Sequence, residues 1–289
     1  MTNPRSYVAL SLLVCSGACA DVAVLTPVAD NTLYLSSTGG VSNGSGTAMF
    51  AGTTADLSAS PRRALLRFDI ASIVPAGATV VSASLTLVEG GSNFDETTCT
   101  VHRVSASWGE GTSVAAGGQG GGTLAQTGDA TWLFRFFPGS AWTNPGGDFN
   151  PSASASLGVG AGAAFTWTST QLAADVQDMA ANPAANFGWL IRGEESLTKT
   201  AKKFSTREDV AENRPKLELR FFVTCAGDLN SDGFVDDSDF VSFAGAYNTL
   251  DCADPTMPAG CPADLNFDGF VDDSDFVLFA AAYDTLVCP

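Results

Sequence analysis

Two segments of the chain carry acidic and amide side chains at a spacing that suits a metal ion. Residues 228–239 read DLNSDGFVDDSD, and residues 264–275 read DLNFDGFVDDSD, 36 positions later. A calcium loop takes oxygen ligands from positions 1, 3, 5, 7, 9 and 12 and has glycine at position 6. Both segments fit, so we expect two calcium ions. The expected ligands are Asp228, Asn230, Asp232, Phe234 (carbonyl), Asp236 and Asp239, then Asp264, Asn266, Asp268, Phe270 (carbonyl), Asp272 and Asp275.

The charge of this region also predicts a metal-dependent unit. The chain has a formal net charge of −17. Residues 225–289 contain 13 Asp and no Glu, Lys or Arg, and so they carry −13 of that total. Carboxylates crowded into two short loops repel each other unless a cation neutralises them. Because metal-binding energy in such a unit is folding energy, we predict that it is largely unfolded without calcium.

A short helical pattern follows each loop. Its apolar residues recur at i, i+3, i+4 and i+7, which places one apolar stripe on each helix. Neither stripe can be buried alone, so we expect the two helices to pack on each other. The stripes are Phe240, Phe243, Ala244 and Tyr247, then Phe276, Phe279, Ala280 and Tyr283.

The duplicated unit resembles a type I dockerin, a double loop–helix module related to the EF-hand. Residues 228–252 and 264–288 are identical at 20 of 25 positions, and both loops have Asp at position 12. The resemblance covers residues 225–289 and implies attachment to a cohesin-like or cell-surface partner. It implies partner contacts at Asp237, Ser238, Asp273 and Ser274, whose identity in both repeats would permit two related binding orientations. Unlike many dockerins, this unit has no Lys or Arg after its loops.

Four cysteines frame the repeats, as in dockerin-like anchors of secreted bacterial proteins whose partner need not be a cohesin. Two pairings fit a two-fold related pair of repeats: Cys225–Cys252 with Cys261–Cys288, or Cys225–Cys288 with Cys252–Cys261. The spacing does not choose between them. Cys99 lies in an alternating apolar–polar run, and we expect it to be a buried free thiol.

Residues 1–20 are expected to be a signal peptide. Arg5 precedes an apolar run at 7–15, and Ala18 and Ala20 form an A-x-A cleavage site. Lipoprotein processing at Cys15 or Cys19 fits the flanking residues less well. The run is too short to span a membrane, and no second segment is long enough. We therefore expect a secreted protein, extracellular or associated with the cell surface, without a transmembrane segment.

Residues 21–224 have the pattern of one large all-β domain. Runs such as 80–88 and 216–221 alternate apolar and polar residues and are separated by turns rich in Gly and Pro. This pattern indicates a β-sandwich with one solvated face on each sheet. One helix is expected, capped by Thr170 and ended by Asn182-Pro183, with Leu172, Val176 and Met179 on one face.

Several segments of this domain resemble the DNRLRE family of extracellular β-sandwich domains. The matching segments are RALLRFDI at 63–70, WGEGT at 108–112, WLIRG at 189–193 and FSTRE at 204–208. The resemblance implies a jelly-roll-like sandwich, and some relatives are carbohydrate-binding modules with acidic polysaccharides among their ligands. The predicted fold is thus mainly β, a jelly-roll-like β-sandwich followed by a small α-helical, dockerin or EF-hand-like module.

Two groups of residues are candidates for carbohydrate binding. Trp108, Trp132 and Trp142 would stack on sugar rings if they are exposed, and otherwise they belong to the core. Lys199, Lys202, Lys203 and Arg207 would hold a uronic-acid polymer if they gather on one face, and otherwise they form an ordinary solvated loop. The overall acidity argues against a nucleic-acid partner.

Catalytic signatures find little support. His102 is the only histidine and lies in a strand pattern, and the G-x-S-x-G match at 40–44 lacks the strand–turn–helix that a nucleophile elbow needs. Glu110 with one of Glu194, Glu195 or Glu208 is the best candidate for a glycosidase pair. Arg63, Arg67 and Asp69 recur in the signature of the resembled family, and an arginine paired with a carboxylate there is expected to be a structural clamp rather than a sugar contact. A non-catalytic protein that binds or displays carbohydrate is favoured over a polysaccharide lyase or glycoside hydrolase, or a purely structural surface protein.

Overall fold

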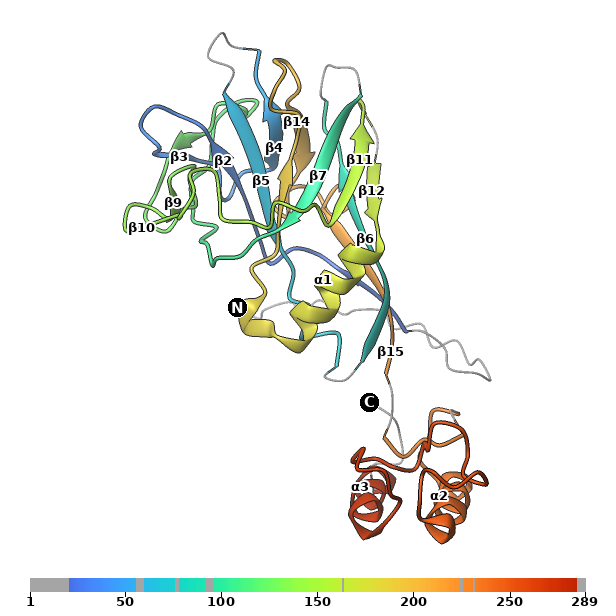
Figure 1. Ribbon diagram of the computed structural model, residues 1–289. Coiled ribbons are helices and arrows are strands. Elements are labelled where there is room, and N and C mark those ends of the chain that lie inside the picture. The colour runs from blue at the N-terminus through green and yellow to red at the C-terminus, as the bar shows by residue number, and fades with distance from the viewer. Residues whose placement is uncertain are drawn as a thin grey trace, which may run out of the picture. The chain divides into compact units, whose positions relative to one another are not determined.

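The computed structural model describes residues 21–55, 60–75, 78–91, 96–162, 164–223, 226–230 and 232–284. Residues 21–221 form one compact unit, and the chain from Phe222 on belongs to a second (Figure 1). The fold is mainly β, as predicted, with a small helical module at the C-terminal end. The expected signal peptide at 1–20 lies outside the described residues, as do Cys225 and Cys288.

The first unit is built from two antiparallel sheets. The smaller sheet has the order β1 (Asp21–Leu25), β15 (Lys216–Phe222), β6 (Thr79–Val88) and β12 (Ala164–Thr168). The larger sheet runs β11 (Ala155–Val159), β7 (Thr97–Arg103), β13 (Trp189–Arg192), β5 (Pro61–Arg67), β4 (Ala48–Thr53) and β14 (Lys202–Ser205), and β2 (Ala29–Tyr34) also pairs with β5. A bridge between Glu89 and Phe204 ties the end of β6 to β14, so the two sheets curl toward each other.

The alternation of residues along the strands explains the sandwich. In β15, Leu217, Leu219 and Phe221 are buried, while the residues between them are exposed. Residues of opposite sheets meet in the interior, where the Trp167 ring of β12 contacts the Phe204 ring of β14 at 6.1 Å between centroids. The Trp167 indole also donates to the carbonyl of Cys99 on β7, at 3.0 Å. Cys99 is fully buried and free, as predicted.

The larger sheet is covered by a further layer that the alternation does not reveal. Strands β2 and β4 are buried at every position. The chain between β7 and β11 makes only short strands, β8 (Thr123–Leu124), which pairs with β3 (Val41–Ser42), and β9 (Phe134–Phe136), which pairs with β10 (Ser140–Ala141). Its side chains pack on Leu33, Leu65 and Leu190 of the larger sheet.

Helix α1 (Thr170–Ala181) closes one part of the sandwich and packs against β6. Leu172, Val176 and Met179 are fully buried, as the sequence pattern predicts. The cap is Ser169 rather than Thr170, because the Ser169 hydroxyl accepts from the Leu172 amide at 2.8 Å and Thr170 is already helical. The chain then makes a 3₁₀ turn, η1 (Pro183–Ala185), since a proline cannot continue the helix.

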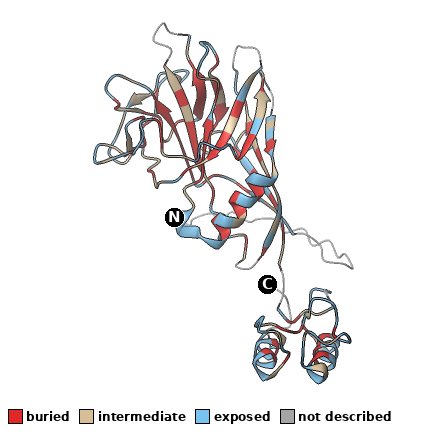
Figure 2. Ribbon diagram, viewed as in Figure 1, coloured by how far each residue is buried: buried red, intermediate tan, exposed pale blue. Residues whose placement is uncertain are grey.

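The second unit contains helices α2 (Asp237–Thr249) and α3 (Asp273–Tyr283), each directly after one acidic loop. Figure 2 shows that each helix is buried along one side and exposed elsewhere. Phe243 and Phe279, each 1% exposed, stack between the helices with ring centroids 4.9 Å apart. Val235 and Val271, at position 8 of the loops, are fully buried in the same core. Each loop is therefore tied to its helix by an apolar anchor.

Candidate calcium loops and docking surface

The first acidic loop brings its carboxylates together. One oxygen from each of Asp228, Asp232 and Asp239 lies within 4.8 Å of the others. Asp239 is fully buried and accepts from the amides of Leu229 at 2.7 Å and Asn230 at 3.0 Å. The loop is folded around this carboxylate, so position 12 braces the backbone as well as facing the other acids.

The second loop repeats the arrangement. Asp275 is fully buried and accepts from the amides of Leu265 at 2.7 Å and Asn266 at 3.0 Å. Asp264 accepts from Asp268 and Gly269, as Asp228 does from Asp232 and Gly233. Gly233 and Gly269 have φ of 92° and 94°, in the left-handed region that glycine adopts without strain. At these described positions the two loops therefore share one hydrogen-bond pattern and one glycine turn.

The donor set of both loops fits calcium. Carboxylate, amide and carbonyl oxygens are hard ligands, which calcium prefers. Residues 225–289 contain no lysine or arginine that would neutralise these acids. Asp228, Asn230, Asp232, Phe234, Asp236 and Asp239, and their counterparts in the second loop, would hold the two ions. Each ion would supply positive charge that balances the acids and closes the loop.

Asp236 and Asp272 also serve as helix caps. The Asp236 carboxylate accepts from the Ser238 amide at 2.8 Å, and the Asp239 carboxylate accepts from the Asp236 amide at 3.0 Å. This reciprocal arrangement is a capping box, and Asp272 with Asp275 repeats it. Positions 9 and 12 of each loop therefore have two roles: they cap the start of the helix, and they are expected ligands of the ion.

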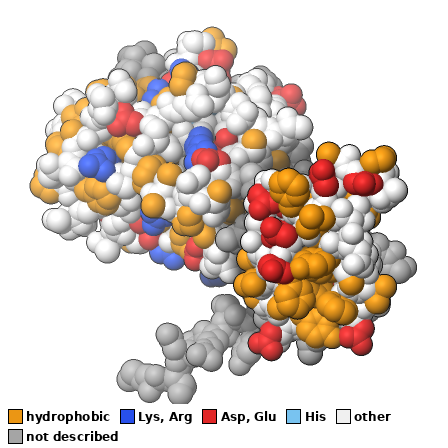
Figure 3. All heavy atoms as spheres, turned by 60° about the horizontal axis from the view of Figure 1, so that its bottom comes forward, with side chains coloured by type: hydrophobic (Ala, Val, Ile, Leu, Met, Phe, Trp, Pro, Cys, Tyr) orange, Lys and Arg blue, Asp and Glu red, His pale blue; other side chains and the backbone are white. Residues whose placement is uncertain are grey.

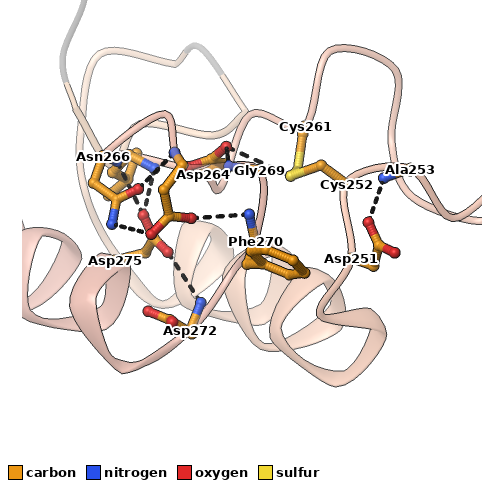
Figure 4. The surroundings of a disulfide bond; sticks show 12 residues. Asp251, Cys252, Ala253, Cys261, Asp264, Asn266, Gly269, Phe270, Asp272 and Asp275 are labelled. Carbon is orange, nitrogen blue, oxygen red and sulfur yellow. Dashed lines mark hydrogen bonds between the residues drawn. A yellow bond between two sulfur atoms is a disulfide. The ribbon is translucent and has the colours of Figure 1, made fainter.

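A disulfide between Cys252 and Cys261 joins the two repeats (Figure 4). The alternative in which each repeat carries its own bond, Cys225–Cys252 and Cys261–Cys288, is therefore wrong. The chain after α2 pairs with the second loop, where Cys252 donates its amide to Gly269 at 3.1 Å and Val271 donates to Leu250 at 2.7 Å. This crossing brings Cys252 beside Cys261 rather than beside its own loop. Because both sulfurs are in the disulfide, neither can bind a metal ion together with the neighbouring Asp264.

The two helices hold each other through a reciprocal pair of hydrogen bonds. The Tyr247 hydroxyl donates to Asp273 Oδ1 at 2.5 Å, and the Tyr283 hydroxyl donates to Asp237 Oδ1. The bond to Asp273 raises the pKa of Tyr247. Asp237 and Asp273 were expected to contact a partner, and the structure also gives them this role between repeats. The repeat of 36 residues relates Tyr247 to Tyr283 and Asp237 to Asp273, so the two hydrogen bonds are equivalent.

An apolar groove lies on the exposed side of the helix pair. It is lined by Phe240, Phe243, Ala244, Tyr247, Asn248, Asp273 and Phe276. Phe240 and Phe276 are 46% and 44% exposed. Figure 3 shows an apolar patch on this module with acidic side chains around it. The exposed Asp237, Ser238, Asp273 and Ser274 begin the same helices.

The candidate sugar-stacking tryptophans do not meet the condition of exposure. Trp108, Trp132 and Trp142 are 3%, 7% and 5% exposed, and they belong to the cluster that covers the larger sheet. The Trp108 indole donates to the Phe187 carbonyl, and the Trp142 indole donates to the Thr131 carbonyl, both at 2.8 Å. The three rings are therefore part of the hydrophobic core and are not available to stack on a sugar.

The basic residues at 199–207 do not form one cationic face either. Lys202 is fully buried, Lys199 is exposed and Lys203 is half-buried. Neighbouring residues of a strand point to opposite sides, which separates Lys202 from Lys203 on β14. Arg207 forms a two-pronged ion pair with Glu110, at 2.6 Å for both contacts. Its guanidinium is committed within the protein.

Of the two signature arginines, Arg63 forms a carboxylate clamp, while the Arg67 guanidinium lies 5.8 Å from the centroid of the Trp108 ring. Arg63 grips Glu195 with two contacts of 2.7 and 2.9 Å and lies 4.7 Å from the centroid of the Trp132 ring. Arg192 adds a third contact to Glu195 at 3.0 Å. Burial acts to raise the pKa of Glu195, but the hydrogen bonds and charge of Arg63 outweigh it and hold that pKa below its usual value. Such a carboxylate is unsuited to be a general acid.

The remaining catalytic candidates are also held by structural contacts. His102 is 4% exposed, with its ring nitrogens 2.9 Å from the Asn150 carbonyl and the Thr100 hydroxyl, and burial lowers its pKa. The fully buried Ser42 hydroxyl is 3.0 Å from both Asn31 Oδ1 and the Ala130 carbonyl. Neither residue contacts the other, so the pattern at 40–44 is not a nucleophile elbow.

One residue near Glu110 was not anticipated. Asp30 is fully buried on β2 beside Glu110, Glu208 and Arg207, and burial raises its pKa well above the usual value. The sequence suggests Glu208 only as the second member of a glycosidase pair. A single Asp in the strand sequence ADNTLY gives no sequence signal for such a cluster, because its partners lie 80 and 178 positions away.

A scan against models of protein families finds no match to this chain, and a search of curated proteins finds none either. Within the described ranges, no helix has both the length and the apolar character needed to cross a membrane.

Proposed function

We propose that residues 225–289 form a calcium-dependent docking module that attaches the β-sandwich to a partner protein. The observation that carries this proposal is the pair of matching acidic loops, in which Asp239 and Asp275 are fully buried and organise the backbone around them. Calcium at both loops would neutralise crowded acids that have no lysine or arginine within the module. The module's resemblance to a dockerin supports the same role.

The docking surface is the exposed side of α2 and α3. Phe240 and Phe276 present apolar rings there, although the module already has a core in Phe243 and Phe279. Exposed aromatic residues surrounded by polar ones are typical of protein interaction sites. Because the acids around the groove are not balanced by bases, the partner should be apolar at its centre and basic at its rim.

The two repeats would allow two docking orientations. The reciprocal bonds from Tyr247 to Asp273 and from Tyr283 to Asp237 relate the helices by an approximate two-fold axis. A partner that recognises one helix first would find nearly the same residues on the other. The partner would be a cohesin-like domain or another cell-surface protein.

The β-sandwich is then the unit that the module displays. The disulfide between Cys252 and Cys261 supports an oxidising, extracellular location. The residues expected to bind a glycan are buried, dispersed or paired, so they lend no support to carbohydrate binding. The two-pronged grip of Arg63 on Glu195 likewise gives no support to hydrolysis by that carboxylate.

The first test is the calcium dependence of the helices in the full chain. Hydrogen exchange measured by mass spectrometry should show protected amides in 237–249 and 273–283 with calcium and fast exchange after chelation. The double variant Asp228→Asn, Asp264→Asn should exchange fast in both conditions, because it removes a charged ligand from each loop. The double variant Asp254→Asn, Asp284→Asn is the matched control, since it removes the same two negative charges outside the loops and should behave like the parent protein.

Docking is tested separately with a panel of purified cohesin domains on a biosensor. The parent chain should bind a panel member with calcium, and Phe240→Ser with Phe276→Ser should abolish that binding without loss of helix protection. Equal protection with and without calcium would refute the metal-dependent module. Binding that survives both serine substitutions would refute the groove as the docking surface.

A further inference from the structure

Three acids from distant parts of the β-sandwich meet at one place. Asp30 lies on β2, Glu110 follows β7, and Glu208 follows β14. One oxygen from each lies within 4.8 Å of the others. This cluster lies in residues 21–221 and is separate in sequence and unit from the acidic loops of the C-terminal module.

The hydrogen bonds of the cluster satisfy only some of its oxygens. Arg207 contacts both oxygens of Glu110 at 2.6 Å and Glu208 Oε1 at 3.0 Å. The Arg207 amide donates to Asp30 Oδ2 at 2.9 Å, and the Asp30 amide donates to Glu110 Oε1 at 2.9 Å. These contacts order the cluster and leave one oxygen of Asp30 and one of Glu208 to be accounted for.

Those two oxygens are buried acceptors without a donor. Asp30 Oδ1 and Glu208 Oε2 have no hydrogen-bond partner among the described residues, and Asp30 is fully buried. Burying an ionised carboxylate without a partner is strongly unfavourable. One guanidinium also faces three carboxylates, which leaves two negative charges if all three are ionised.

We propose that Asp30, Glu110 and Glu208 bind one calcium ion in the β-sandwich. A divalent cation would balance the two remaining charges and would give Asp30 Oδ1 and Glu208 Oε2 the partner that they lack. The donor set contains only oxygen, which selects hard cations, and calcium completes its shell readily with water. The side chains of Glu110 and Glu208 are 17% and 20% exposed, which gives the ion and its waters a route from solvent.

The ion would stabilise the sandwich by cross-linking three of its segments. It would join β2 near the start of the domain, the segment that covers the larger sheet, and the turn after β14. Arg207, in the turn after β14, already contacts Asp30 through its amide and Glu110 through its guanidinium, and the ion would add a direct link among the three carboxylates. Calcium would then stabilise both units of the protein through different residues.

Tryptophan fluorescence reports on the β-sandwich and not on the C-terminal module. All five tryptophans, at 108, 132, 142, 167 and 189, lie in the β-sandwich unit, and the C-terminal module has none. In thermal melts of the full chain after chelation, we expect calcium to raise the tryptophan-reported Tm by about 5–10 °C at a free concentration roughly 100 times its Kd. Magnesium, which demands stricter geometry, should raise it less.

Two variants separate the sandwich site from the loops. Asp30→Asn should abolish the calcium shift, and in chelator it should melt above the parent protein because it removes an uncompensated buried charge. The control Asp228→Asn with Asp264→Asn should keep the full tryptophan-reported shift. Native mass spectrometry should count three calcium ions on the parent chain and two on Asp30→Asn.

Glu208→Gln provides a second variant if Asp30→Asn does not fold. It is partly exposed and should lose the calcium shift in the same way. A parent chain without a calcium shift, or variants that retain it, would overturn the proposal. If Asp30→Asn is more stable than the parent in both buffers and the parent shows no shift, the carboxylates share a proton instead and bind no metal.

Discussion

The stacked rings of Phe243 and Phe279 allow a quantitative test of the C-terminal module. Each ring is 1% exposed, and the centroids are 4.9 Å apart across the helix pair. We predict that Phe243→Ala and Phe279→Ala destabilise the module equally, because the two repeats place these residues in equivalent surroundings. The comparison tests the two-fold relation as well as the core.

The expected loss follows from burial. Replacing a buried Phe by Ala costs about 3–5 kcal/mol, of which the aromatic pair accounts for about 0.5–1.5 kcal/mol. A module of this size has a total stability of roughly 3–10 kcal/mol at about 0.05–0.15 kcal/mol per residue. Either substitution should therefore remove a large part of the stability of the module, and it would unfold a module at the low end of this range.

Hydrogen exchange of α2 and α3 in the full chain measures this loss, because the exchange rate of protected amides gives the free energy of opening. Phe240→Ala and Phe276→Ala are the controls, since these rings are 46% and 44% exposed and should cost much less. A loss below about 1 kcal/mol for Phe243→Ala, or clearly unequal losses for the two buried rings, would refute the reasoning.

Three further predictions concern the β-sandwich. Glu195→Gln should cost roughly 2–4 kcal/mol in urea unfolding followed by tryptophan fluorescence, less than for a fully buried pair because Glu195 and Arg63 are 11% and 12% exposed. An unchanged midpoint would contradict the clamp, and Glu212→Gln, at an exposed position, is the control. Burial lowers the pKa of His102, so the unfolded chain binds more protons and stability falls as the pH drops below about 6.5; melts from pH 8 to pH 5 should show a smaller fall for His102→Gln, and parallel curves would disprove this contribution. Burial raises the pKa of Cys99 to about 12, so iodoacetamide at pH 8 should label its peptide only after denaturation; labelling of the folded protein would show that the thiol is accessible.

The loop–helix repeats could be predicted from the sequence because their information is local. Twelve consecutive positions specify the oxygen ligands, the glycine turn and the start of the helix, so Asp228 and Asp239 meet through the fold of a single loop. The alternation in 216–221 is equally local, and the structure confirms it as β15 with its apolar residues buried. These patterns need no knowledge of the rest of the chain.

The disulfide and the covering layer could not be predicted in this way. Cys252 pairs with Cys261 because the chain after α2 crosses to the second loop, and the cysteine spacing allowed both pairings. Trp108, Trp132 and Trp142 have the composition of a sugar-binding surface, but the irregular chain that carries them folds onto the larger sheet. An aromatic residue has the same sequence signature whether it is exposed or buried.

The sequence by itself determined the two acidic loops, the paired helices and the alternating strands, because each depends on residues within a few positions of one another. Tertiary structure alone decided which long-range partners meet. It buried Lys202, committed Arg207 to Glu110 and placed Asp30 beside acids 80 and 178 positions away. The physical reason is that burial and charge pairing depend on how distant segments pack, and side-chain type records only what a residue is able to do there.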